Sequence, residues 1–193
     1  PKPMLTDNSF DISYQLKKGV HYEKQANHFD IGYEILFDGA QCLRFNKDIV
    51  INCSNENHLL GAQWLTRHLK GYDVHIVRMV DNHIDSTMLP LREGVLLVNP
   101  RKFKDEHLPD FLKKWDRIVA PEPEHQQTLL ASKYIDMNVL SIGPQKVMVS
   151  SNYIPLIRLL EQNGFTPVPV QLRHRRLFGG GFHCITLDTI RKD

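Results

Sequence analysis

The chain has 193 residues, of which 41% are apolar and 24% charged, and its formal net charge is +2 at pH 7. This composition is typical of a water-soluble globular protein and excludes a disordered or fibrous chain, while the length is sufficient for one large domain or two small ones. Every apolar run is shorter than the roughly 18 residues that a membrane-spanning helix requires, so we expect no membrane span.

The cysteines and the basic residues exclude several further classes of protein. The three cysteines are Cys42, Cys53 and Cys184, and an odd, sparse set argues against a disulfide scaffold and for a reducing compartment. No pair has zinc-ligand spacing and the ten histidines are scattered, so we expect neither a metal nor another cofactor. The one dense basic run, residues 173–176, is more typical of a solvated loop than of a phosphate contact, so we expect no nucleic-acid partner.

The first predicted unit covers residues 36–80 and runs strand, strand, helix, strand. Apolar runs in DGAQCLRF and KDIVINC predict its two leading strands, and VHIVRMV predicts its last. Ser54 or Asn55 can cap the helix between them. Leu60, Trp64 and Leu69 fall near one face of that helix.

The second predicted unit, residues 81–123, repeats this order. IDSTMLPL and GVLLV predict the leading strands, and RIVAP predicts the last. The predicted helix carries four apolar residues at helical spacing, which are Leu108, Phe111, Leu112 and Trp115.

The third predicted unit covers residues 132–172, with strands in IDMNVLSI, KVMVS and PVPVQL. Its helix has an apolar side and ends near Gly164, which stands where a C-terminal cap belongs. The apolar residues of that side are Ile154, Ile157, Leu159 and Leu160. A further strand, FHCITLDTI, is predicted within residues 179–193 and closes the chain.

Repetition at this spacing of roughly 50 residues suggests modules stacked around an axis, and we expect one α/β domain over residues 1–193. Polar residues begin the leading strand of each unit and the closing strand. They are Asp38, His83 with Asp85, Asp136, and His183 with Cys184. Each aspartate taken alone is more typical of a turn. Four sets at matched strand ends, one containing a cysteine, favour convergence on a single site.

Several stretches carry a resemblance to a known family. FDGAQCLRFNKDIV, NHIDSTMLPLREGVLLVNP, SKYIDMNVL, KVMVSSNYIPL and LFGGGFHCIT together resemble the glycine amidinotransferase family, whose members move an amidino group from arginine to an amine. The resemblance covers the chain from end to end but only about the C-terminal half of the family. It implies the pentein fold, a five-bladed propeller of strand-strand-helix-strand modules, with about three blades present here.

The resemblance implies roles for four residues of the chemistry. Cys184 stands at the position of the nucleophile and His83 at that of the general acid/base. Asp38 and Asp85 match carboxylates that hold the substrate guanidinium, and Asp38 is counted with the catalytic residues. A thiolate suits attack on the weakly electrophilic guanidinium carbon, and paired carboxylates suit a planar cation.

Three further residues correspond to substrate recognition. Arg101 corresponds to an arginine that binds the substrate carboxylate, with Lys102 as the alternative, and Ser132 matches a serine that contacts the amino-acid end of the substrate. The chain departs from the family where Gln41 replaces a second carboxylate and Asp136 replaces a serine. The half of the family that lies outside this chain supplies two blades and one more guanidinium-binding carboxylate.

The resemblance therefore predicts an amidinotransferase that uses arginine as donor and an amine, glycine by default, as acceptor, through a covalent amidino-Cys184 intermediate. Two alternatives stay open: a deiminase with water as acceptor, and a non-catalytic fragment that acts by association. Expected partners are these small molecules together with either a second copy, as in a homo-oligomer such as a dimer, or the missing N-terminal half. The expected location is the cytoplasm, or the mitochondrion in an animal.

Other chemistry-bearing residues have plainer interpretations. Cys42 and Cys53 fall in strand patterns and are expected to be inert core residues, while Trp64 and Trp115 are expected to pack. His183 is expected to be a structural hydrogen-bonding group rather than a second base. The histidines expected to have no catalytic role are His58, His68, His75, His107 and His125.

Overall fold

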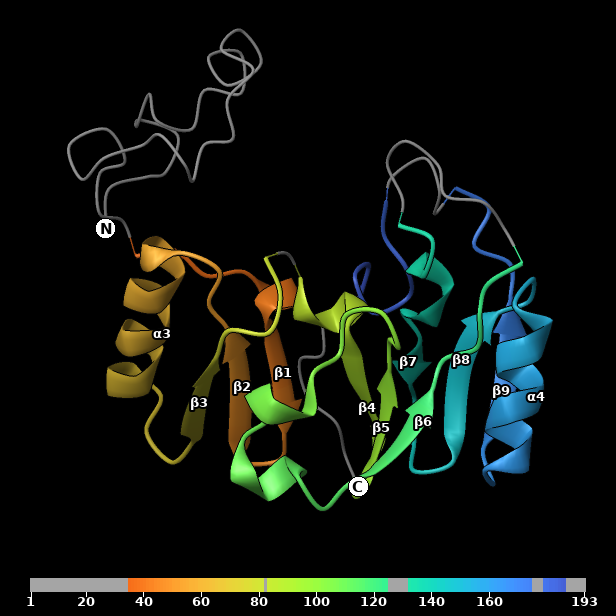
Figure 1. Cartoon of the computed structure of the whole chain (residues 1–193), viewed down its shortest axis with the longest axis horizontal. Helices are drawn as coiled ribbons and strands as arrows, with labels where there is room; N and C mark the ends of the chain where they lie inside the picture. Colours follow the sequence, from red (N-terminus) through yellow and green to blue (C-terminus); the bar gives the residue numbers. More distant parts are fainter. Residues whose placement is uncertain (1–34, 82, 125–131, 175–178, 187–193) are drawn as a thin grey trace, which may run out of the picture.

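The computed structural model describes residues 35–81, 83–124, 132–174 and 179–186. They form three separate three-stranded sheets that stand side by side, each built from one continuous stretch of chain (Figure 1). In every sheet the leading strand is antiparallel to the second, and the second is parallel to the third. The expected α/β class is confirmed, whereas closure into five blades stays a prediction.

The first module contains the 3-10 turn η3 (Gly39–Gln41), β1 (Cys42–Phe45), β2 (Asp48–Asn52), α3 (Glu56–His68) and β3 (Asp73–Val77). Of the two predicted caps for α3, Asn55 is the one that closes the helix, because its side-chain oxygen accepts the His58 N–H at 2.9 Å. The Ser54 hydroxyl instead lies 2.9 Å from Nδ1 of His58.

The second module contains η4 (Ile84–Ser86), β4 (Met88–Arg92), β5 (Val95–Val98), the turns η5 (Asp105–His107) and η6 (Asp110–Leu112), and β6 (Asp116–Val119). The helix predicted across Leu108 to Trp115 is therefore wrong, since only the short 3-10 turn η6 forms within that range and η5 ends just before it. Pro109 explains the difference. Proline lacks an N–H and pushes the residue before it out of the helical region, and Leu108 is accordingly extended, at φ −72° and ψ 141°.

The third module contains η7 (Ile135–Met137), β7 (Leu140–Ser141), β8 (Lys146–Ser150), α4 (Ile154–Gln162) and β9 (Thr166–Val170). Gly164 adopts a φ of 78° just after the helix, a conformation that suits glycine, and this confirms it as the C-terminal stop. The predicted closing strand FHCITLDTI is wrong over residues 182–186, since residues 182–185 form a turn, and residues 187–193 lie outside the described part.

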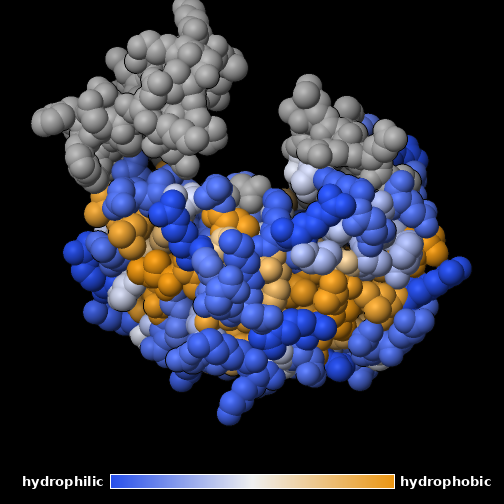
Figure 2. All heavy atoms as spheres, in the orientation of Figure 1, coloured by the Kyte–Doolittle hydropathy of each residue, from blue (hydrophilic) through white to orange (hydrophobic). Residues whose placement is uncertain are grey.

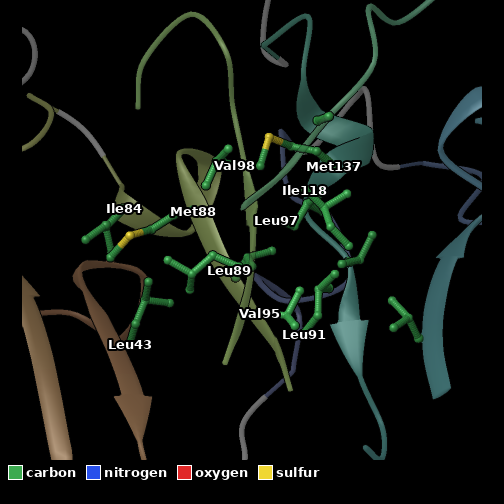
Figure 3. Close-up of a cluster of buried hydrophobic side chains, with 14 of the residues drawn as sticks. Leu43, Ile84, Met88, Leu89, Leu91, Val95, Leu97, Val98, Ile118 and Met137 are labelled. Carbon is green, nitrogen blue, oxygen red and sulfur yellow. The ribbon is translucent and has the colours of Figure 1, made fainter. Parts of the chain in front are cut away.

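The hydrophobic core is centred on β4 and β5, which lie between the other two sheets (Figure 3). Leu89, Leu91, Leu96 and Leu97 are all essentially inaccessible to solvent. β4 contacts both β1 and β7, and the Ser141 hydroxyl donates a hydrogen bond to the Leu91 carbonyl at 2.6 Å. The leading strands of the three modules are therefore neighbours. Burial of each of the four core leucines contributes about 1.5–3 kcal/mol to the stability of the fold.

Each leading strand is preceded by a 3-10 turn, and the turns ahead of β1 and β4 lie together at the upper end of the sheets in Figure 1. The polar residues predicted to begin strands stand in or beside these turns instead. The reason is local: the Asp38 carboxylate accepts the Gln41 N–H at 3.0 Å and closes the turn before extended pairing can start. Matched turns, rather than matched strand ends, bring these residues to one end of the fold.

Apolar side chains also reach the surface. Figure 2 shows them in two main areas of one face, around α3 and β3 and around β6 and β8. Ile76, Val119, Ile142 and Ile154 are among the exposed large apolar residues. Within the described residues, none of the helices has the length and apolar character needed to cross a bilayer.

Candidate active site

Asp38 and His83 occupy equivalent places, since each is the residue immediately before a 3-10 turn. The two turns, η3 and η4, contact one another. His83 Nε2 consequently lies 3.9 Å from Asp38 Oδ2, with both side chains about half exposed. Two of the three predicted catalytic residues are thus paired at the surface.

The third predicted catalytic residue, Cys184, lies against Asp85. Its Sγ is 3.2 Å from Asp85 Oδ2, although the two residues are 99 positions apart in the chain. Nδ1 of His183 lies 3.1 Å from the same oxygen, which fits the hydrogen-bonding role expected for this histidine. The Asp85 side chain is only 1% exposed, and its Oδ1 has no hydrogen-bond partner among the described residues.

The protonation states of this pair follow from its surroundings. Burial favours a raised pKa for Asp85, but hydrogen bonds from His183 and Cys184, the charge of His183 and a hydrogen bond from Asn138 outweigh it and lower the pKa. Partial burial of the thiol, in a residue that is exposed overall, and the negative charge of Asp85 raise the pKa of Cys184 from 9.0 to about 11. At neutral pH the carboxylate is therefore ionised and accepts a hydrogen bond from an un-ionised thiol.

The glycine run before Cys184 serves two distinct needs. Gly179 has a φ of 72°, in the region that side chains rarely adopt. Gly181 lies against Asn138, where an added Cβ would stand 2.5 Å from the Asn138 Cβ and 2.7 Å from its Oδ1. At Gly180 the nearest contact of an added Cβ would be 3.3 Å, to the Cβ of Cys184. Close approach of backbone is required at Gly181.

Asn138 is a site residue that the sequence reasoning missed. Its Nδ2 donates to the Asp85 carbonyl at 3.2 Å, and its Oδ1 accepts the Cys184 N–H at 3.0 Å. The available signal was the repeat itself, because Asn138 follows the turn IDM just as Thr87 follows IDS in the preceding module.

Arg101 lies outside the Cys184–Asp85 pair and forms no hydrogen bond with it. Its side chain is 61% exposed, donates from Nη2 to Glu122 Oε1 at 2.8 Å and lies over the ring of Tyr134. Glu122 also accepts hydrogen bonds from Lys133 and from the Tyr134 hydroxyl. One carboxylate therefore fixes two cations at the start of the third module.

The other residues considered for substrate recognition have surroundings of their own. Lys102 is half-buried, and burial lowers its pKa. Ser132 contributes its carbonyl to the start of η7, where it accepts the Ile135 N–H at 3.1 Å. Gln41, which replaces a family carboxylate, is buried, and its Oε1 accepts a hydrogen bond from Asn52 at 2.9 Å.

The residues expected to be structural have structural surroundings. Burial raises the pKa of both Cys42 and Cys53 to about 11. Trp64 stacks on Phe37, and Trp115 meets Phe45 edge to face. Across the four described ranges, no group of three or more histidine, cysteine, aspartate or glutamate side chains is arranged to hold a metal ion.

Solved structures with the same repeated α/β modules identify the architecture. Inosamine-phosphate amidinotransferase from Streptomyces griseus superimposes with a TM-score of 0.81 at 38% identity, covering all of this chain and 55% of that one. An amidinotransferase from Microseira wollei, of a saxitoxin biosynthetic pathway, also gives 0.81, at 35% identity. A dimethylarginine dimethylaminohydrolase, with a TM-score of 0.60 and 17% identity over 76% of the chain, shares the fold alone. The architecture is of the pentein type.

Sequence comparison specifies the family. Inosamine-phosphate amidinotransferase 1 of Streptomyces griseus is 38% identical over 99% of the chain, and the L-arginine:L-lysine amidinotransferase of Pseudomonas savastanoi pv. phaseolicola is 34% identical over 100%. The mitochondrial glycine amidinotransferase of Xenopus laevis is 32% identical over 100%. The chain belongs to the amidinotransferase family. It spans about half the length of these curated relatives, 54%, 54% and 48% respectively, and no family model matches it.

Proposed function

We propose that the protein containing this chain transfers the amidino group of arginine to an amine, with Cys184 as the nucleophile. The observation that carries this proposal is the Cys184 thiol, held 3.2 Å from the buried carboxylate of Asp85 in an exposed loop. Family membership supports the reaction class, and the thiol–carboxylate pair supports the choice of residue.

The charges at the site explain why a guanidinium is a suitable substrate. Removing the thiol proton in the free protein would leave a thiolate and a carboxylate about 3 Å apart, which is unfavourable, and this repulsion adds to the effect of burial in raising the pKa of Cys184. A bound guanidinium reverses the balance because it is permanently cationic and can donate to both anions. Asp85 and Asp38 would orient it through charge-assisted hydrogen bonds.

The transfer proceeds in two half-reactions. As arginine binds, the Cys184 thiol gives its proton to His83, and the resulting thiolate attacks the guanidinium carbon so that a C–S bond forms. The C–N bond to the ornithine nitrogen then breaks as His83 donates a proton to that nitrogen, leaving an S-amidino-cysteine cation and neutral ornithine amine. An incoming amine attacks the same carbon and gives its proton to His83, the C–S bond breaks, and the thiolate returns. Asp38, 3.9 Å from His83, would stabilise the protonated imidazole.

The second substrate is the amine that accepts the amidino group. The relatives are named for inosamine phosphate, lysine and glycine, all of which present an amine. We propose glycine as the first acceptor to test. Arg101, held by Glu122, is proposed to bind a substrate carboxylate, with Ser132 near the amino-acid end.

Product analysis tests the reaction class. The complete protein is incubated with arginine alone and with arginine plus glycine, lysine or an amino-cyclitol phosphate, and ornithine, citrulline and ammonia are measured. Amine-dependent ornithine release is expected, and Cys184→Ala should abolish it. Citrulline and ammonia formed without an amine would show a deiminase instead, and no turnover in any mixture would favour a non-catalytic protein.

A further inference from the structure

We infer that Asn138 is a positioning residue that ties the loop carrying Cys184 to the turn carrying Asp85. The inference rests on the proposed function only in taking Cys184 as the reacting group. The tie itself is a property of the fold and can be measured without turnover.

Both ends of the Asn138 amide are used across long distances in sequence. Nδ2 reaches the Asp85 carbonyl, 53 residues away, and Oδ1 receives the Cys184 N–H, 46 residues away. The Asn138 carbonyl also accepts the Phe182 N–H at 2.8 Å. A side chain in this place must donate on one side and accept on the other, which an amide does and a carboxylate or a hydrocarbon does not.

The surroundings leave the Asn138 side chain little freedom. It is 1% exposed, and Gly181 packs directly against it. A methyl group at position 181 would overlap the Asn138 Cβ and Oδ1, both within 2.7 Å, so the loop can reach its hydrogen bonds only with glycine there. Asn138 thus packs against Gly181 and is hydrogen-bonded to Cys184, so the three residues hold one another in place.

These contacts determine where the Cys184 Sγ lies relative to the Asp85 carboxylate. The Asn138 carbonyl holds the backbone of residue 182, its side-chain Oδ1 holds that of residue 184, and its Nδ2 holds the Asp85 turn, so a single residue fixes the two elements whose Sγ and Oδ2 lie 3.2 Å apart. Asn138 also acts on both charges, because its hydrogen bonds favour the ionised forms of Asp85 and Cys184. Misplacement of a reacting atom by about 1 Å can cost roughly 100-fold in rate.

Asn52 provides a matched control. It is fully buried, and its side chain likewise bridges separate segments: Oδ1 accepts the Met79 and Val80 N–H groups, and Nδ2 donates to the Val80 carbonyl and to Gln41 Oε1. None of these partners belongs to the Cys184 loop. Replacing Asn52 therefore removes a comparable buried amide while leaving the thiol and its carboxylate in place.

The experiment combines hydrogen exchange with steady-state kinetics on the complete protein. In Asn138→Ala, amide exchange of the peptide spanning residues 179–186 should accelerate at least tenfold, and kcat should fall by about 100-fold with KM for arginine changed less than threefold. Asn138→Asp keeps an acceptor for the Cys184 N–H and loses the donor to Asp85. It should therefore restore protection of the loop but not kcat.

Two controls separate positioning from general stability. Asn52→Ala should speed exchange in its own module and leave residues 179–186 unchanged, and Gly181→Ala should reproduce the Asn138→Ala pattern. Unchanged exchange of the Cys184 loop in Asn138→Ala, or an equal change in Asn52→Ala, would overturn the inference. If the parent protein shows no amidino transfer, the exchange measurements still decide the role of Asn138, so the two proposals fail separately.

Discussion

Replacement of Asp85 by asparagine separates the two effects that this carboxylate has on the site. Asparagine has nearly the same shape but no charge, so the nearest negative charge to the thiol disappears. Burial is the first cause of the raised Cys184 pKa and remains, whereas the contribution of Asp85, the second cause, is lost. The pKa should therefore fall from about 11 by on the order of one unit and stay above 9.0.

The expected effect on reactivity is opposite to that on turnover. One pKa unit corresponds to roughly tenfold more thiolate, so iodoacetamide should alkylate Cys184 of Asp85→Asn roughly ten times faster at pH 8. Amidino transfer should fall at least about 100-fold in kcat/KM, because the substrate cation loses a charged partner. Stability should drop by about 1–3 kcal/mol, the usual cost of leaving buried polar groups without partners.

The assay follows modification of the Cys184 peptide by mass spectrometry between pH 7 and pH 10, which distinguishes it from the peptides of Cys42 and Cys53. Asp38→Asn is the matched control, because Asp38 bonds to the Gln41 N–H and pairs with His83 but does not contact the thiol. The pH dependence of Cys184 alkylation in Asp38→Asn should match that of the parent protein. Slower or unchanged alkylation in Asp85→Asn would refute the reasoning, since the carboxylate would then contribute nothing to the raised pKa of the thiol.

Three other predictions concern recognition, the core and alkaline pH. Glu122→Gln removes the charge that holds Arg101, so KM for the carboxylate-bearing substrate should rise about fivefold with kcat within twofold; an unchanged KM in steady-state assays would exclude that anchor. Leu97→Ala, at the centre of β5, should cost about 2–5 kcal/mol in urea unfolding, and a loss below about 1 kcal/mol would contradict the assigned core. The thiols of Cys42 and Cys53 have a pKa of 9.0 in the unfolded chain, and burial raises it to about 11 in the folded protein. Their contribution to the free energy of unfolding is therefore complete below pH 9 and is lost as the pH rises to 11. Cys53→Ala should make unfolding midpoints fall less over that interval, and an unaltered slope would count against burial as the cause.

The sheets could be predicted from sequence because each strand has a local signature. Short apolar runs between turn residues predicted β2, β5 and β8 within their units, and Gly164 marked the end of α4. The helix of the second module failed because apolar spacing was given more weight than Pro109, whose ring restricts the backbone before it.

The candidate site contains features that local sequence patterns do not predict. Asp38, His83 and Asp85 were identified as polar residues at matched positions, but their 3-10 turns were not foreseen, since hydrogen bonds such as that from the Gln41 N–H to Asp38 decide them. Asn138 was missed because its partners are 46 and 53 residues away, and the repeat marks its position without showing what its side chain bonds to. Buried polar contacts of this kind depend on the assembled fold.

The most direct test of the central claim is the mass of the complete protein after brief reaction with arginine and no amine, quenched in acid. We predict one added amidino group, located on the Cys184 peptide, with one ornithine released per modified chain and no modification in Cys184→Ala. Ornithine release without any adduct, or an adduct that persists in Cys184→Ala, would contradict the assignment of Cys184 as the nucleophile.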